Sequence, residues 1–184
     1  MRIPVLGPLR PHSHIREWLV SDPIPIPLFD GQVLPVVLED PRTEEESEVE
    51  KVICAFLKLD RQDRLAISRY VFANYRRIAE LVTAQQLGWP SSQDCEWYGD
   101  FPTIETEDAV WQHVQPQEIY ISRRGRRDCD IYVSIAAECS WEPEHGLQIV
   151  YRRGSVLVRV SDQDGHLTHT DAYDLPEDQD KIVD

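Results

Sequence analysis

The sequence predicts an α+β fold, in which two main helices pack on an antiparallel β-sheet. Apolar residues recur at helical spacing in the middle of the chain, and apolar and polar residues alternate in its C-terminal third. The sheet is expected to combine a C-terminal meander with N-terminal edge strands. At 184 residues the chain is long enough for one buried core. We therefore expect residues 1–184 to form a single α+β domain, with mobile ends at 1–13 and 175–184.

The N-terminal stretch is rich in proline. Between Pro23 and Leu28, prolines alternate with apolar residues. Alternation places the apolar side chains on one face of an extended segment, but the missing N–H donors exclude a central strand. An edge strand or an extended arm is therefore expected here. Gly31 permits a turn, and Val33–Leu38 is predicted to be a second short strand that ends at Asp40-Pro41.

The first main helix is predicted over residues 44–58. Thr43 and Glu46 have the spacing of a capping box, and the acidic residues between Glu44 and Glu48 suit a helix N-terminus, where the dipole favours negative charge. Apolar residues then follow at helical spacing and predict one buried stripe. The stripe consists of Val49, Val52, Ile53, Phe56 and Leu57.

The second main helix is predicted over residues 61–84, with Asp60 as its cap and Gly88 and Trp89-Pro90 as stop signals. Its inward stripe is Leu65, Val71, Tyr75, Ile78, Ala79 and Val82. Its arginines are expected to lie on a solvated face, because an amphipathic helix needs a polar side. These are Arg61, Arg64, Arg69, Arg76 and Arg77.

Residues 91–102 are expected to form a loop that contains aromatic residues. Aromatic residues in a loop can mark a surface that binds a protein partner. The candidate partner-binding residues are Trp97, Tyr98, Phe101 and, further along the chain, Trp141. The commoner outcome is that loop aromatics fold back as a small satellite core, and this interpretation is favoured here.

The C-terminal third predicts an antiparallel meander from Ile119 to Val160. A short helix that is capped by Thr106 and ends before Pro116 leads into it. Turn signals at Gly125 and at Arg153-Gly154 divide the meander into hairpins, and the alternation predicts one buried face. The expected core positions are Ile131, Val133, Ile135, Leu147, Ile149, Val156 and Val158.

The chain is strongly acidic, with a formal net charge of −14. Such a charge repels phosphate backbones, so nucleic acid is an unfavourable partner and a basic protein is a favourable one. An acidic net charge can also serve only to keep the protein in solution, and this is the commoner explanation. Arg123, Arg124, Arg126 and Arg127 form a dense basic patch around Gly125, and we expect this patch to be a solvated hairpin tip.

Cysteine usage and hydropathy bear on the compartment. Cys54, Cys95, Cys129 and Cys139 include no CxxC pair, which predicts free thiols in a reducing cytoplasm. The N-terminus lacks the unbroken apolar run of a signal peptide, and no segment approaches the roughly 18 consecutive apolar residues that would span a bilayer. We expect a cytoplasmic protein that binds no membrane and carries no cofactor.

Carboxylates and imidazoles are expected to gather at one end of the sheet. A tight turn at Arg153-Gly154 would place His145 opposite Asp162. The resulting candidate metal ligands are Glu144, His145, Asp162, Asp164 and His166. Such a set could bind zinc or act as an acid–base pair. A structural interpretation is favoured, in which proline and glycine shape the turn at 141–146 and its tryptophan packs on the end of the sheet.

No complete catalytic motif is present. The sequence contains no G-x-S-x-G, no P-loop, no G-x-G-x-x-G and no H-E-x-x-H. Enzymatic activity therefore has no positive signal, and a non-enzymatic role is favoured.

Three segments together resemble a known family. They are Glu17-Trp18, the run Ile24–Phe29 followed by Gly31, and above all Cys139–Leu147, which contains W-x-P-E-H-G-L. The chain resembles, from about Trp18 to Val160, a family of uncharacterised bacterial proteins defined by a domain of unknown function. Some of its members are described as immunity proteins of polymorphic toxin systems. The resemblance implies the fold more than it implies a function.

Two functional hypotheses follow from the sequence. The first is a non-enzymatic protein-binding factor, such as an immunity or accessory protein of a bacterial toxin or defence system, which presents acidic and aromatic surface to a basic protein. The second is a metal-binding module or metal-dependent hydrolase that uses the five candidate ligands. The charge and the loop aromatics favour the first.

Overall fold

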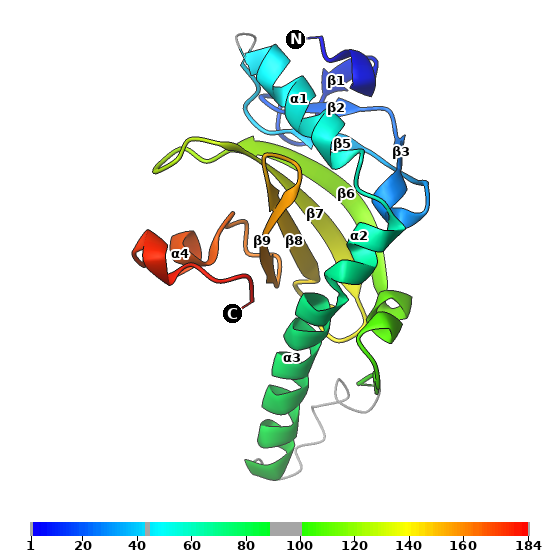
Figure 1. Ribbon diagram of the computed structural model, residues 1–184, viewed down its shortest axis with the longest axis vertical. Coiled ribbons are helices and arrows are strands. Elements are labelled where there is room, and N and C mark those ends of the chain that lie inside the picture. Colours follow the sequence, from blue (N-terminus) through cyan, green and yellow to red (C-terminus); the bar gives the residue numbers. More distant parts are fainter. Residues whose placement is uncertain (1, 43–44, 89–100, 184) are drawn as a thin grey trace.

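A seven-stranded β-sheet forms the centre of the molecule (Figure 1). The computed structural model describes residues 2–42, 45–88 and 101–183. In spatial order the strands are β1 (Leu9–Pro11), β2 (Leu19–Ser21), β5 (Val36–Leu38), β6 (Val114–Arg123), β7 (Ile131–Cys139), β8 (Leu147–Arg152) and β9 (Val156–Ser161). The β6 to β9 meander confirms the expected C-terminal arrangement, and helices pack on the sheet, so the fold is α+β.

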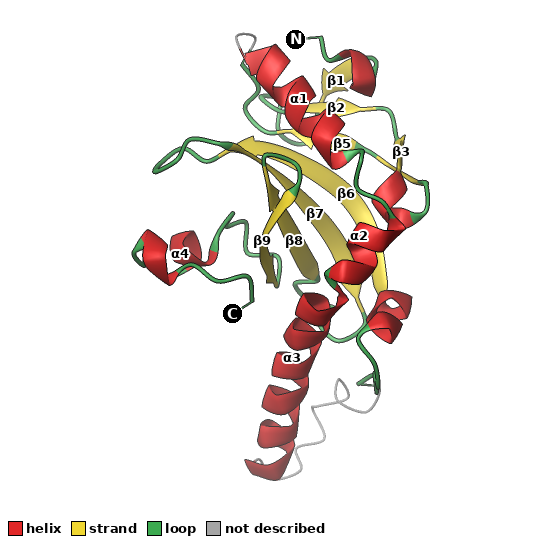
Figure 2. Ribbon diagram, in the orientation of Figure 1, coloured by secondary structure: helices red, strands yellow, loops and turns green. Residues whose placement is uncertain are grey.

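The helices occupy the middle and the end of the chain (Figure 2). The α-helices are α1 (Glu46–Phe56), α2 (Arg61–Ala66), α3 (Ser68–Gly88) and α4 (His169–Ala172). Short 3-10 helices are η1 (Pro4–Leu6), η2 (Pro27–Phe29), η5 (Asp108–His113) and η6 (Glu177–Gln179). Across the described ranges, none of these helices has the length and apolar character needed to cross a membrane.

Pro35 divides the N-terminal strands between two sheets. We expected residues 33–38 to form one strand, and this was wrong. Instead β4 (Gln32–Leu34) pairs with β3 (Ile24–Ile26) in a separate two-stranded sheet, while β5 enters the large sheet. The reason is that proline has no N–H to continue a ladder. The proline-rich β3 is an edge strand, as predicted.

The large sheet is not purely antiparallel, which corrects our expectation. β5 runs parallel to β6, with Val36 opposite Ile119 and Leu38 opposite Ile121. The chain passes through α1, α2 and α3 between these two strands. A crossover of that length is what parallel neighbours require.

Helix α1 buries the predicted apolar stripe against the sheet. Val49, Val52, Ile53 and Phe56 are all buried, and α1 packs on β7. The helix begins at Glu46 with Glu45 as its N-cap, and Glu45 makes no side-chain capping bond. The proposed capping residue Thr43, together with Glu44, lies outside the described residues.

The predicted second helix is two helices that break at Ile67. Asp60 caps α2 as expected: its Oδ1 accepts from Gln62 N at 2.7 Å, and Asp63 Oδ2 accepts from Asp60 N at 2.9 Å. The break turns the stripe, so Leu65 is 38% exposed while Ile67 is buried. Our placement of Leu65 in the inward stripe was therefore wrong. The rest of the predicted stripe up to residue 82 faces inward along α3.

Two arginines of this region are not on a solvated face. Arg64 is 13% exposed, pairs with Asp30 at 2.7 Å and lies 5.7 Å from the ring centre of Trp111. Arg77 is 29% exposed and pairs with Asp162 at 2.9 Å. Both guanidinium groups tie the helices to distant segments.

The meander begins earlier than predicted and contains a proline. The expected short helix is η5, whose N-cap is Glu107 rather than Thr106, and β6 follows directly at Val114. Pro116 is therefore inside a strand. It sits beside a register shift between residues 116 and 118, the kind of irregularity at which strands tolerate proline.

The core face of the meander matches the predicted alternation through β8 and departs from it in β9. Of the predicted core positions, those in β7 and β8 are buried, but Val156 is 56% exposed and Val158 is only partly buried. A register shift between Val150 and Tyr151 changes the phase of the β8–β9 ladder. Val160, after the shift, is fully buried.

The sheet is covered on both faces, although one buried face was predicted. Tyr132 and Ser134 point away from the α1 face and are 1% and 8% exposed. The C-terminal segment after β9 lies over this second face, and Figure 1 shows α4 apart from α1, α2 and α3. Gln148 Nε2, for example, donates to the carbonyl of His166 at 2.7 Å.

Both ends of the chain make specific contacts. Ile3 and Leu6 belong to the core. At the other end, Val160 N donates to Ile182 O at 2.6 Å, and Val183 forms a parallel bridge with Val160. The mobility that we expect for residues 1–13 and 175–184 stays a prediction, as does the single domain.

Candidate functional site

The aromatic residues proposed for partner binding lie in different surroundings. Trp97 and Tyr98 fall outside the described residues. Phe101 stacks on Tyr75 with ring centres 5.8 Å apart, so it folds back onto the core. Trp141 is 1% exposed and packs edge-on against Tyr75. The predicted burial of Trp141 on the sheet end is confirmed, and a buried side chain offers no surface to a partner.

The five candidate metal ligands are not brought together. Asp162 pairs with Arg77, and Asp164 makes two contacts of 2.7 Å with the guanidinium of Arg159. His166 Nδ1 is 3.5 Å from Asp164, whereas Glu144 and His145 are exposed on the turn before β8. Among the described residues, no group of three or more His, Cys, Asp and Glu side chains is placed to hold a metal ion.

The register explains why the expected cluster does not form. We expected His145 opposite Asp162, but beyond the register shift in the β8–β9 ladder Gln148 pairs with Ser161. That pairing is two positions away from the predicted one. His145 Nδ1 instead lies 3.2 Å from Glu142 Oε1, within its own turn.

The basic patch around Gly125 is not a solvated hairpin tip. Arg124 is 4% exposed and contacts Asp171 and Glu177 at 2.8 Å and Asp128 at 3.1 Å. Arg127 also pairs with Glu177. The C-terminal segment supplies Asp171 and Glu177. No local pattern indicates this pairing, because these two partners are distant along the chain. The patch is thus an anchor for the C-terminal segment.

A pocket on the second face of the sheet combines a carboxylate, hydroxyls and amides with aromatic rings, and we take it as the candidate functional site. It has a volume of about 280 Å³. We call it the sheet pocket, and its lining is Trp18, Glu39, Tyr120, Ser122, Ser134, Ala136, Gln148, Gln163, Gly165 and Leu167. Its floor is the set of alternate positions of β6, β7 and β8 that face away from α1.

Neighbouring strands bring the key residues of the sheet pocket together. Tyr120 lies opposite Ser134 in the β6–β7 ladder, and Glu39 N donates to Ile121 O at 2.9 Å, which places Glu39 beside Ser122. Trp18 stands at the entry to β2, and its ring meets Tyr120 edge-on with centres 6.2 Å apart. One wall of the pocket is therefore aromatic.

The carboxyl of Glu39 is held in partly buried surroundings. Burial raises the pKa of Glu39, the hydrogen bond with Ser122 opposes this, and the negative charge of Asp40 adds to it. Among the described residues Glu39 forms no ion pair. The pKa of Tyr120 is also raised, by burial, by its hydrogen bond to Glu118 and by the charges of Glu118 and Glu39. Tyr120 thus stays protonated, and its O–H donates a hydrogen bond to Glu118.

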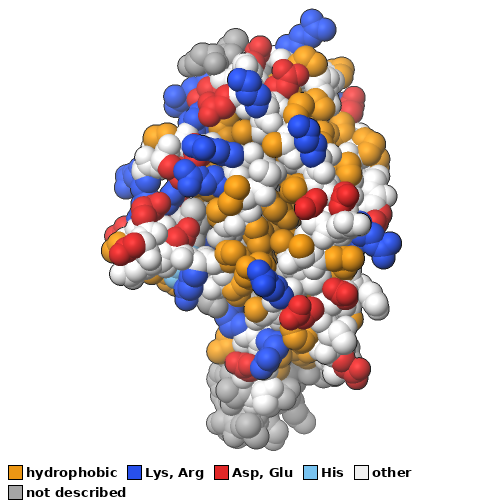
Figure 3. All heavy atoms as spheres, in the orientation of Figure 1, with side chains coloured by type: hydrophobic (Ala, Val, Ile, Leu, Met, Phe, Trp, Pro, Cys, Tyr) orange, Lys and Arg blue, Asp and Glu red, His pale blue; other side chains and the backbone are white. Residues whose placement is uncertain are grey.

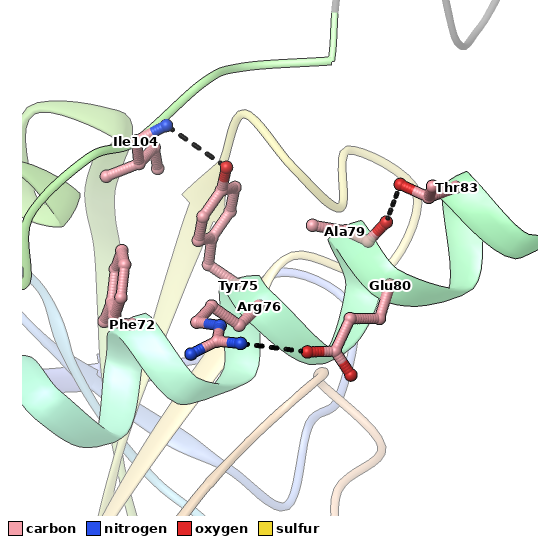
Figure 4. A pocket seen from close by; sticks show the side chains of 7 residues that line it. All are labelled: Phe72, Tyr75, Arg76, Ala79, Glu80, Thr83 and Ile104. Atoms are coloured by element: carbon pink, nitrogen blue, oxygen red, sulfur yellow. Dashed lines mark hydrogen bonds and ion pairs between the residues drawn. The ribbon is translucent and has the colours of Figure 1, made fainter.

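Two larger pockets in the described part of the chain carry different chemistry. One, of about 500 Å³, lies along α3 and is mainly apolar (Figure 4). The hydroxyl of Tyr75 accepts from Ile104 N at 3.1 Å at its edge. The other, of about 690 Å³, contains His113 and Ser140, whose Nδ1 and Oγ are 2.9 Å apart. That exposed pair joins η5 to the end of β7, where Ser140 N also donates to His113 O at 3.1 Å.

Sequence reasoning did not find the sheet pocket. Trp18 was noticed only for its part in a resemblance, and Glu39, Ser134 and Gln148 were not singled out. The available signal was the polar character of alternate positions in β6 to β8, which marks a face that does not join the apolar core.

Comparison with known proteins identifies a family. The model of a domain of unknown function, DUF6985, matches residues 5–167. This range contains the large sheet, helices α1 to α3 and the lining of the sheet pocket. Neither the curated proteins nor the solved structures include a significant match. Since the match extends over most of its length, the chain belongs to the DUF6985 family.

Proposed function

We propose that this chain is a non-enzymatic binding protein whose partner is a basic protein, recognised at the sheet pocket. The observation that carries the proposal is an acidic, aromatic-walled pocket in a chain of net charge −14. A negative surface accelerates the encounter with a basic partner, and a pocket with fixed polar groups supplies specificity.

The use of arginine supports this proposal. Several arginines are paired with carboxylates of other segments, so their charge is neutralised within the chain. They include Arg64, Arg77, Arg123, Arg124, Arg127, Arg152, Arg153 and Arg159. Since Asp and Glu number 33 against 19 for Lys and Arg, the acidic surplus remains for the surface. Figure 3 shows acidic and basic side chains interspersed on one face, so that face carries no continuous basic patch.

The biological role that we propose for such a binder is that of a cytoplasmic immunity or accessory protein in a bacterial toxin or defence system. The family resemblance noted in the sequence motivates this role. An immunity protein must capture its partner quickly, and electrostatic attraction raises association rates above those of neutral pairs.

Affinity capture from cells of the source organism, at low and at moderate salt, tests the proposal. We expect one basic protein to be recovered, with an association rate that falls as salt increases. Glu39→Lys should reduce its recovery, whereas Glu80→Lys, which makes the same charge change on the exposed side of α3, should not. Repeated failure to recover any specific protein, or equal recovery by both variants, would contradict the proposal.

A further inference from the structure

The polar atoms of the sheet pocket that remain uncommitted are mainly hydrogen-bond acceptors. Gln148 Nε2 donates to His166 O at 2.7 Å and Gln163 Nε2 donates to Ala137 O at 3.0 Å, which leaves the two amide oxygens for a ligand. The phenol O–H of Tyr120 donates a hydrogen bond to Glu118. Glu39 is an acceptor whenever it is ionised.

The pocket also contains a hydroxyl that is free to bond a ligand. Ser134 is 8% exposed and lines the pocket, and its Oγ makes no hydrogen bond to any described residue. A hydroxyl that lines a pocket and has no protein partner can bond a ligand or water. Because a hydroxyl can accept, Ser134 adds to the same acceptor set.

A ligand that matches this set carries several N–H donors and a positive charge. Guanidinium has five donors in a plane, whereas an ammonium has three around a point charge. The plane can also stack on an indole, and Trp18 provides one at the pocket wall. The volume of about 280 Å³ is at the lower limit for small-molecule sites and suits one side chain.

Three other partly buried carboxyls of this protein are paired with arginine, which Glu39 is not within the described ranges. Burial would raise the pKa of Asp128, Asp130 and Asp164, but hydrogen bonds and neighbouring arginines outweigh it and lower each of them. Glu39 has no arginine or lysine partner among the described residues, and its pKa is raised. A guanidinium in the sheet pocket would supply the missing partner.

We propose that the sheet pocket binds the guanidinium group of an arginine side chain presented by the basic partner. This inference rests on the proposed function and names the chemical group that the site recognises. Glu39 accepts from the guanidinium, Ser134 and the amide oxygens of Gln148 and Gln163 accept from its remaining N–H groups, and Trp18 stacks on its plane.

Titration of the isotope-labelled protein with three blocked amino acids tests this by NMR. The probes are N-acetyl-arginine amide, its uncharged isostere N-acetyl-citrulline amide, and N-acetyl-lysine amide. We expect saturable shifts of the Trp18 indole N–H and the Ser134 amide with the arginine probe. Citrulline should bind about tenfold more weakly or worse, because it lacks the charge that pairs with Glu39, and lysine should bind several-fold more weakly.

Two variants locate the interaction. Glu39→Gln should weaken arginine binding by about tenfold, since a charged hydrogen bond is replaced by a neutral one. Glu80→Gln makes the same charge change where Glu80 pairs with Arg76 on α3, and it should leave binding unchanged. If Glu39→Gln proves unfolded in its NMR spectrum, the comparison of arginine with citrulline on the unaltered protein still decides.

The outcomes separate this inference from the proposed function. Equal binding of arginine and citrulline, or binding of neither, overturns the guanidinium site even if a basic protein is captured. Arginine binding without capture of any protein overturns the proposed function. It also overturns the proposal that a partner protein supplies the guanidinium, and it assigns the site to a free guanidino compound. If a partner is captured, replacing its contact arginine by lysine should weaken the complex about tenfold or more; an unchanged affinity would contradict the proposal.

Discussion

The indole nitrogen of Trp141 donates a hydrogen bond to Oδ1 of Asn74 across 3.0 Å. Both residues are 1% exposed, and the bond joins the turn after β7 to helix α3. Asn74 Nδ2 in turn donates to Asp162 at 3.3 Å, and Asp162 pairs with Arg77. One buried tryptophan therefore connects the helix layer, the end of the meander and the segment after β9.

Trp141→Ala should lower the free energy of unfolding by about 3–5 kcal/mol, because a large buried side chain is removed and the amide of Asn74 loses its partner. His145→Ala, four residues later in the same turn, is the matched control. The His145 side chain is 61% exposed, so its loss should cost about 1 kcal/mol or less. Urea unfolding of both variants measures the difference, and similar losses for the two would contradict the structural role of Trp141.

Arg124→Met should destabilise the protein by about 3–5 kcal/mol, because it removes the cation from a buried cluster and leaves Asp128, Asp171 and Glu177 without it. Arg126 is exposed in the same hairpin, and Arg126→Met should change stability by no more than about 0.5 kcal/mol. Denaturant unfolding tests both. Equal losses of stability in the two variants would support the solvated hairpin tip that the sequence predicts.

Gly154→Ala should destabilise the protein far more than Gly165→Ala. Both glycines have positive φ, +80° and +78°, so both substitutions carry similar backbone strain of about 1 kcal/mol. A Cβ at Gly154 would lie 2.2 Å from the carbonyl oxygen of Val52 in α1, whereas at Gly165 nothing lies within 4 Å. The difference between the two losses, measured by thermal unfolding, isolates the contact between the β8–β9 turn and α1. No difference would mean that α1 can shift away.

Acid should weaken the anchor of the C-terminal segment. Hydrogen bonds from Arg124, then Arg127, lower the pKa of Glu177 from 4.5 to about 2. A carboxyl with a lowered pKa in the folded state stabilises that state above its unfolded pKa, and the stabilisation is lost as pH falls towards the folded one. The melting temperature should therefore fall between about pH 4.5 and pH 2, and by less in Glu177→Gln.

The control for this pH dependence is Glu144→Gln, which removes an exposed carboxyl that lies outside the cluster. Its melting temperature should follow the pH dependence of the unaltered protein. If Glu177→Gln shows the same acid dependence as the unaltered protein, the Arg124 cluster does not anchor the C-terminal segment.

Local patterns along the chain determined much of the fold. The helix cap at Asp60, the stripe of α1 and the alternation of β7 are short-range signals, and each was predicted from residues close in sequence. The burial of Trp141 followed from its size and its place beside a polar turn. These features follow from local backbone geometry and the hydrophobic effect, which act on neighbouring residues.

The tertiary structure alone decided the features that depend on distant partners. The two halves of the strand that Pro35 splits pair with different neighbours, and the register of the β8–β9 ladder moves His145 away from Asp162. Arg124 is buried because the chain returns more than forty residues later with Asp171, as their separation of 47 positions shows.

The sheet pocket belongs to the same class. Trp18, Glu39, Ser134 and Gln148 come from four strands or their ends, and each by itself is an ordinary residue in the sequence. The composition alone determined that the chain is acidic, from which we predict a basic partner. Strand order and register decided which carboxylate, aromatic rings and hydrogen-bond acceptors lie together in the sheet pocket. The reason is that long-range strand pairing sets which side chains share a face.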